Sequence, residues 1–305
     1  MDLYLSTLPG AVAFGIIWGI MAIGVYITYK VLDVADLTVD GSFASGGLVA
    51  AIWITSGGNP VLGMLFGFLV GMAAGLVTGL LHTLLGIPAI LSGILTQLSL
   101  WSVNLVITSG RSNLSVSARA FDVLVSPLDI GGSIAKLALI LAIIIGALYL
   151  FFGTELGASI RATGSNAKMA RAVGINVKLN TVLGLMIANG IVGLAGSLFV
   201  QYQGAADIKM GTGAIVIGLC AVVIGGSIAG RILNFAAKLL GVALGGVVYY
   251  VIYQSVVFLG MPTDLLKLLA ALVIVVLLGV PYLAKRHKRG AQDLWRRLIH
   301  GKEGN

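Results

Sequence analysis

The polar residues that could make specific contacts outside an apolar environment gather in one stretch, residues 154–180, between two long apolar runs. Its side chains suit charge pairing and hydrogen bonding with a partner surface rather than covalent chemistry. Its basic residues are Arg161, Lys168, Arg171 and Lys178. Its glycines predict breaks in the backbone at Gly157, Gly164 and Gly174. The run from Ala167 to Ala172 predicts a short helix between the last two breaks, offered to a partner.

A second group consists of uncharged polar side chains inside the apolar runs, where they could hydrogen-bond a polar solute. Gln97, Trp101 and Asn104 recur on one face of a helix. Similar candidates elsewhere in the chain are Asn189, Ser197, Gln201 and Tyr253. These residues could equally bond neighbouring helices, which contributes about 0.6–2 kcal/mol per pair in membranes, and Tyr253 could belong to an interfacial aromatic belt. Both interpretations stay open.

The sequence lacks the residue patterns that ATP binding, metal binding and catalysis would need. No phosphate-binding loop of the G-x-x-x-x-G-K-[ST] type occurs. His82 has no neighbouring metal ligand in the sequence, and Cys220 is the single cysteine. We therefore predict no catalytic residue, no metal site and no cofactor in this chain. No Asp, Glu, Lys or Arg lies deep inside an apolar run, so the energy for any transport should come from elsewhere.

The composition places these residues in a membrane protein. The chain is 58% hydrophobic and 10% charged, with a mean hydropathy of +1.06. Apolar runs long enough to span a bilayer lie near 10–29, 61–85, 88–108, 181–203, 236–259 and 264–284, with shorter runs near 41–56, 136–152 and 214–229. The fold class predicted is all-α: a polytopic transmembrane helical bundle of about nine spans, within a range of roughly eight to ten.

Glycine spacing predicts how two helices pack. Five glycines recur every four residues and fall on one helix face, namely Gly63, Gly67, Gly71, Gly75 and Gly79. Without side chains they let another backbone approach closely, which is how helices associate in lipid. Asp36 and Asp40 lie before the next expected span, and Asp40 could cap a helix beginning at Gly41.

Weak self-similarity predicts an internal repeat. At a shift of 174 positions Gly67 matches Gly241, Gly71 matches Gly245 and Pro88 matches Pro262. The halves would cover about 10–108 and 181–284. Because five spans separate equivalent elements, one half would be inverted relative to the other, as in many transporters.

The distribution of basic residues predicts the orientation. If residues 153–180 are cytoplasmic, alternating spans place fourteen of the 19 Lys and Arg inside and five outside. This favours an N-terminus outside and a C-terminus in the cytoplasm, and it explains the net charge of +8 without nucleic-acid binding. Residues 1–284 form the transmembrane domain, and the basic tail 285–305 could form an amphipathic helix on anionic lipid.

The polar stretch resembles the cytoplasmic coupling loop of permease subunits in bacterial ABC importers of the branched-chain amino acid, ribose and nucleoside type. The matching positions are Leu156, Gly157, Arg161, Ala162, Asn166, Ala170, Arg171, Gly174, Ile175 and Asn176. The resemblance covers nearly residues 10–284, and the string LTVDGSF at 37–43 is most similar to the tryptophan and tyrosine subgroup.

The resemblance implies a non-enzymatic subunit of the bacterial inner membrane that forms a path for a small polar solute. Its implied partners are ABC ATPase subunits that bind ATP and Mg, an extracytoplasmic substrate-binding protein, and a second permease, either a copy or a paralogue. Amino acids, aromatic or branched-chain, lead as substrates, with nucleosides and sugars as alternatives. A stand-alone secondary transporter or channel is the competing hypothesis, and an intramembrane enzyme lacks the residues it would need.

Overall fold

A computed structural model describes residues 2–230, 234–258 and 275, with side chains from residue 7 onward. Nearly all of its regular structure is helical. The elements in chain order are α1 (Asp2–Tyr26), the π-helix η1 (Ile27–Val31), α2 (Val39–Thr55), α3 (Pro60–Thr83), α4 (Ala89–Ile107), β1 (Asn113–Ser115), α5 (Ile130–Gly153), α6 (Glu155–Ser165), α7 (Ala167–Ala172), α8 (Val177–Gln203), β2 (Ala205–Asp207), α9 (Ala214–Ala229) and α10 (Phe235–Phe258).

Six helical segments in the described part of the chain are long and apolar enough to cross a membrane. They are α1 continued by η1, α3, α4, α5, α8 and α10, while α2 and α9 are shorter apolar helices. The chain is thus a polytopic helical membrane protein. The run expected near 136–152 is longer than predicted, because Asp129 accepts a 3.0 Å hydrogen bond from the Gly132 amide and caps α5 at Ile130. The run 264–284 and the tail 285–305 lie outside the described residues.

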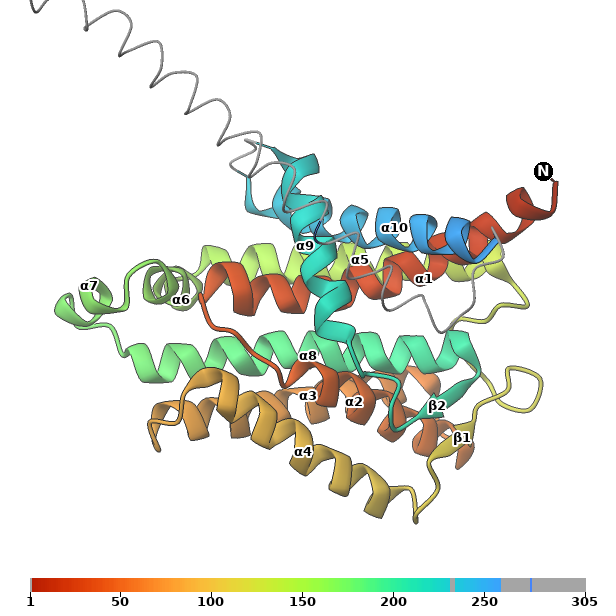
Figure 1. Cartoon of the computed structure of the whole chain (residues 1–305), viewed down its shortest axis with the longest axis horizontal. Helices are drawn as coiled ribbons and strands as arrows, with labels where there is room; N and C mark the ends of the chain where they lie inside the picture. Colours follow the sequence, from red (N-terminus) through yellow and green to blue (C-terminus); the bar gives the residue numbers. More distant parts are fainter. Residues whose placement is uncertain (1, 231–233, 259–274, 276–305) are drawn as a thin grey trace, which may run out of the picture. The chain divides into compact units, whose positions relative to one another are not determined.

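The long helices α1 and α8 are largely buried and pack against each other at the centre of residues 2–258. They run in opposite directions: α1 leads away from the N-terminus, and α8 returns toward that end (Figure 1). The helices α2 and α3 pack on α8, and α9 and α10 pack on α1. Outside this arrangement, α4 contacts α2 and α3, and α5 contacts α1 and α10.

The glycine face of α3 lies against α8. A Cβ atom added at Gly71 or Gly75 would come within 3 Å of α8 backbone atoms, those of Asn189 and Leu185 respectively. Gly67 faces the backbone oxygen of Gly46 on α2 and that of Gly193 on α8, while Gly79 faces Val182 and Gly63 is in ordinary contact with α2. The two helices therefore touch backbone to backbone, so dispersion contacts replace the hydrophobic effect that lipid cannot supply.

The two ends of the bundle differ in character. The helices α6 and α7 project at one end, where the chain also turns between α3 and α4 (Figure 1). At the other end β1 and β2 form a short antiparallel pair, with Asn113 opposite Asp207 and Ser115 opposite Ala205. The polar helices α6 and α7 and the β1–β2 pair therefore lie at opposite ends of the bundle.

Candidate functional site

A buried carboxylate lies in the interior of the bundle. The segment between η1 and α2 turns inward and leaves Asp36 only 2% exposed. Asn189, in the middle of α8, donates a 2.6 Å hydrogen bond to Asp36 Oδ2, and the Thr38 amide donates one of 2.9 Å to Asp36 Oδ1. The Ser42 hydroxyl donates a 2.7 Å bond to Asn189 Oδ1. The side-chain amide of Asn189 on α8 thereby bonds both the segment between η1 and α2, at Asp36, and the start of α2, at Ser42.

The prediction on ionisable residues concerned the apolar runs only and did not address Asp36, which is buried all the same. The sequence places Asp36 in a polar turn outside every apolar run, but the fold carries that turn to the depth of Asn189. Irregular backbone is tolerated at such depth where the protein itself satisfies its polar groups, as the hydrogen bonds from Thr38 and Asn189 do here.

A chain of buried hydroxyls continues from the same segment to α4. Thr38 Oγ1 lies 2.6 Å from Thr78 Oγ1 on α3, and the Thr78 hydroxyl donates a 2.9 Å hydrogen bond to Thr96 Oγ1 on α4. All three threonines are buried. This chain holds the otherwise lightly packed α4 at a fixed rotation against the bundle.

Asp40 caps a helix far away in the sequence. Its Oδ2 accepts a 2.8 Å hydrogen bond from the Gly213 amide, and its Oδ1 accepts one of 2.9 Å from the Ile215 amide. The predicted cap of a helix at Gly41 was wrong, because α2 already begins at Val39 and Asp40 lies within its first turn. The carboxylate instead satisfies the free amides at the start of α9 and favours the positive end of that helix dipole.

A small cavity adjoins Asp40. Its polar and aromatic lining comes from Asp40, Gln97, Trp101, Asn104 and Thr212. Three of these residues are the candidates predicted on one face of the span at 88–108, so the structure brings them to one place. The cavity measures about 30 Å³, enough for roughly two water molecules. An amino acid or sugar does not fit in this volume.

Asn104 and Trp101 give this cavity its chemical character. Asn104 is 2% exposed, and its Oδ1 has no hydrogen-bond partner among the described residues. A buried acceptor without a donor costs about 1–3 kcal/mol, so it favours a water or a solute N–H or O–H group. Trp101 is 42% exposed, and Lys209 Nζ lies 6.0 Å from the centre of its ring. A cation, an aromatic face and a hydrogen-bond acceptor thus lie together.

The remaining path candidates lie elsewhere. Asn189 is engaged with Asp36, as described above, and the Ser197 hydroxyl donates to the Leu194 carbonyl on its own helix at 2.6 Å. Gln201 Oε1 accepts a 2.9 Å hydrogen bond from the Leu124 amide. Tyr253 packs near Tyr250, with ring centres 5.2 Å apart. None of these four residues lines the cavity beside Asp40.

The polar stretch folds into two helices rather than one. The predicted helix is present as α7, with the predicted bounds, and Gly174 has a φ of +86°, as a break requires. The breaks predicted at Gly157 and Gly164 were wrong, since both lie inside α6. They are points of close approach instead: a Cβ there would meet the backbone of Phe152 and of Leu32 respectively.

Two predicted loop residues act as helix caps. Asn166 Oδ1 accepts hydrogen bonds from the amides of Lys168 and Met169 and starts α7, and Asn176 Oδ1 accepts one from Leu179 and starts α8. Ala170, in the middle of α7, is buried, and Ala162 and Ile175 are half-buried. Exposed positions of the loop include Leu156, Arg161, Asn166, Lys168, Arg171, Gly174 and Asn176.

The exposed end of the loop also carries apolar side chains. Met169 is 67% exposed and Val173 is 68% exposed, next to Lys168 and Arg171. Apolar side chains surrounded by charges, on a helix that projects from the bundle, are typical of a docking surface.

The loop is joined firmly to the interior. The Asn180 side chain on α8 donates a 3.1 Å hydrogen bond to Thr163 Oγ1 on α6. The helix α6 also packs on η1, the element that leads to Asp36. The helix α6 is therefore in direct contact both with α8 and with the element that precedes Asp36.

Six helices long and apolar enough to cross a membrane, a small and partly polar cavity, and two short polar helices packed on one end are the features of a polytopic membrane protein. Residues 8–278 match the family described as branched-chain amino acid transport system, permease component. The chain belongs to this family and is a permease component of an ABC transport system, not an enzyme.

Among curated proteins, a tyrosine transport system permease protein of Clostridioides difficile (strain R20291) is 36% identical over 266 residues, which cover 87% of this chain and 88% of that protein. An uncharacterised protein of Rickettsia prowazekii (strain Madrid E) is 34% identical over 85% of this chain and 92% of its own length. The inner membrane ABC transporter permease protein YjfF of Escherichia coli (strain K12) is 31% identical over 39% of this chain and 36% of its own length. No solved structure matches the chain significantly.

Some residues of the site were not predicted. The depth of Asp36 and the cavity wall at Thr212 depend on contacts between distant elements, which periodicity does not report. Met169 and Val173 had a usable signal: two large apolar residues four positions apart, in and just after a short helix that also carries Lys168 and Arg171.

Proposed function

We propose that this chain forms the translocation path for an amino acid, aromatic or branched-chain, in an ABC importer. The observation that carries the proposal is the small cavity in which Asp40, Trp101 and Asn104 meet. Its acceptors suit an ammonium group, and Trp101 suits an apolar or aromatic side chain. The relative named for tyrosine transport supports an aromatic substrate. Nucleosides and sugars are the alternatives.

The energy comes from partner ATPase subunits, which bind ATP and Mg, so this chain needs no cofactor. They contact the docking surface on α7 and the adjoining loop positions from Leu156 to Asn176. The attachment of α6 to α8 supports this role, because closure of the ATPases moves the helix that holds Asp36. A substrate-binding protein docks at the opposite end, and a second permease, either a copy or a paralogue, completes the path.

An uncoupling experiment tests the assignment of the loop. Arg171→Glu and Gly174→Pro should leave the chain inserted but abolish uptake in reconstituted vesicles, together with substrate-stimulated ATPase activity. Gly57→Pro is the matched control, because Gly57 also has a positive φ, of +84°, but lies in the turn between α2 and α3 at the other end. Wild-type uptake in both loop variants would contradict the assignment.

We further propose about nine spans arranged as an inverted repeat. Six long and two short apolar helices, together with the run 264–284, support the number. The packing supports the repeat: α3 lies on α8 as α10 lies on α1, and α2 lies on α3 as α9 lies on α10. The opposite directions of α1 and α8 agree with an inversion (Figure 1).

In the proposed orientation, the N-terminus lies outside the bacterial inner membrane and the C-terminus lies in the cytoplasm. The helices α6 and α7 lie on the cytoplasmic side. Impermeant thiol reagents on intact cells test it after replacement of Cys220, the single native cysteine. Lys168→Cys on α7 should stay unlabelled, and Ser117→Cys at the opposite end should react. If only the thiol on α7 reacts, α7 lies outside the cell. That result would contradict both the proposed orientation and the proposed contact with the ATPases.

A stand-alone carrier is the second candidate, favoured by the repeat-like packing of α1–α3 and α8–α10. Co-purification of an ATPase with the chain supports the importer. Solute uptake by the chain alone, in vesicles without ATP, would establish the carrier instead.

A further inference from the structure

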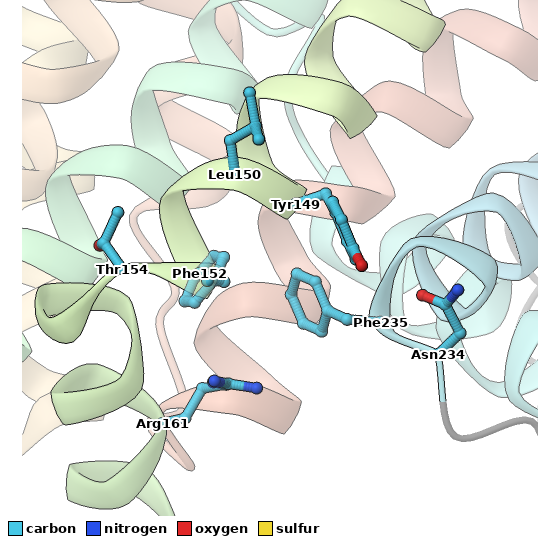
Figure 2. Close-up of a pocket in the computed structure, with 8 residues that line it drawn as sticks. Tyr149, Leu150, Phe152, Thr154, Arg161, Asn234 and Phe235 are labelled. Carbon is cyan, nitrogen blue, oxygen red and sulfur yellow. The ribbon is translucent and has the colours of Figure 1, made fainter.

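A pocket of about 710 Å³ lies where α5 ends and where α6 and α10 begin. Its polar side chains are Arg161, Thr154 and Asn234, and its aromatic ones are Tyr149, Phe152 and Phe235. Figure 2 shows Arg161 extending from α6 toward the space in front of Phe152 and Phe235. The size is typical of a pocket that holds a small organic group.

The positive charge of Arg161 is not matched by the pocket. Within the part of the chain that the structure describes, its guanidinium has no hydrogen-bond or carboxylate partner. Glu155, its neighbour at the start of α6, is not among the lining residues. A guanidinium presents a planar set of donors that fits phosphate oxygens, so the pocket favours a phosphate-bearing ligand.

An apolar surface leads to this pocket along α5. Leu139, Ile143 and Leu150 fall on one face of the helix and are 62%, 61% and 72% exposed. Since α5 is long and apolar enough to cross a membrane, this face lies against lipid chains. Leu150 lines the pocket as well, so the hydrocarbon-facing surface and the charged pocket are continuous.

We infer that the pocket binds one anionic phospholipid, with its phosphate on Arg161 and an acyl chain along Leu139 and Ile143. The end of a membrane-crossing helix lies at headgroup depth, where aromatic side chains such as Tyr149 also favour the interface. Basic pockets between helices are a known chemical basis for recognising anionic headgroups. The pocket shares no lining residue with the cavity beside Asp40.

Native mass spectrometry of the full chain tests the site. The chain is released from nanodiscs that contain equal amounts of phosphatidylglycerol and phosphatidylcholine, and the retained lipids are counted. The wild type should retain one phosphatidylglycerol per chain. Arg161→Gln should lower this preference about tenfold, as expected for loss of one charge-assisted contact. Arg161→Lys should lie between, because it keeps the charge without the planar fork.

Lys168→Gln is the matched control, since it removes the same charge from an exposed residue outside the pocket. An equal loss in this control, or an unchanged preference in Arg161→Gln, would overturn the site. Inorganic phosphate that displaces the lipid and raises the thermal midpoint equally would show a free-anion site and overturn the lipid assignment. If Arg161→Gln cannot be purified, Leu150→Ala carries the test: weaker lipid retention supports the site, and unchanged retention contradicts it.

Discussion

Asn189, in the middle of α8, donates a 2.6 Å hydrogen bond to the carboxylate of Asp36, which lies 153 positions earlier in the chain. This bond completes a continuous route through the molecule. The docking loop is fixed to α8 through Asn180 and Thr163. From Asp36 the chain leads directly into α2, whose Asp40 caps α9. The loop and the cavity beside Asp40 are thus connected through packed, hydrogen-bonded elements.

Replacing Asn189 with leucine should destabilise the protein strongly. The change leaves the Asp36 carboxyl group buried with one donor fewer, and a buried acceptor left without its donor costs about 1–3 kcal/mol, or more when it is charged. The thermal midpoint in detergent measures the effect. Ser197→Ala is the control on the same helix, because the Ser197 hydroxyl bonds only a carbonyl of α8 in the described structure. Equal midpoints for the two variants would contradict the role given to Asn189.

Asp40→Ala should impair uptake more than its effect on stability explains. It removes the cap of α9, which costs about 0.5–2 kcal/mol, and also a polar wall of the cavity. Asp129→Ala removes a cap from α5 at an exposed site away from the cavity. Uptake in vesicles and thermal midpoints of both variants separate the two roles. If the two variants have equal thermal midpoints and lose uptake equally, the result would contradict a role of the cavity beside Asp40 in transport.

Gly71→Ala should destabilise the bundle by about 1–3 kcal/mol, because the added methyl group meets the α8 backbone at Asn189. Gly146→Ala on α5 is the matched control, since nothing lies within 4 Å of its Cβ position. That change should be neutral or stabilising by up to about 1 kcal/mol, from the helix preference of alanine. Thermal unfolding of both variants compares them, and a tolerated Gly71→Ala would contradict the close approach of α3 to α8.

Val173→Asp should reduce ATPase binding and coupled uptake without lowering the thermal midpoint. Val173 is 68% exposed, so the carboxylate stays in water and folding is unaffected. At a docking surface the same charge would have to be desolvated. Leu128→Asp, at an equally exposed site of 63% in the connection before α5, is the control. Co-purification of the ATPase with both variants measures the difference, and retention by Val173→Asp would place the contact elsewhere.

Much of the helical framework was predictable because it depends on local composition. Each apolar run up to residue 258 is a helix, since a membrane span must satisfy its backbone internally. The short helix Ala167–Ala172 followed from helix preference and from glycine at position 174. The error at Gly157 and Gly164 has a specific reason: glycine serves close helix contacts as readily as breaks, and only the neighbour at that point distinguishes the two uses.

By itself, the sequence determined that this is a multi-span helical permease and which faces of its helices are small or polar, because hydrophobicity and periodicity are properties of each segment. Only the tertiary structure decided that Asp36 lies beside Asn189, that Asp40 caps α9 and that Asn104 lines a small cavity next to Asp40. Those outcomes depend on which buried polar groups meet across more than a hundred positions, and such pairing is settled by packing, since each group must find its partner inside the protein.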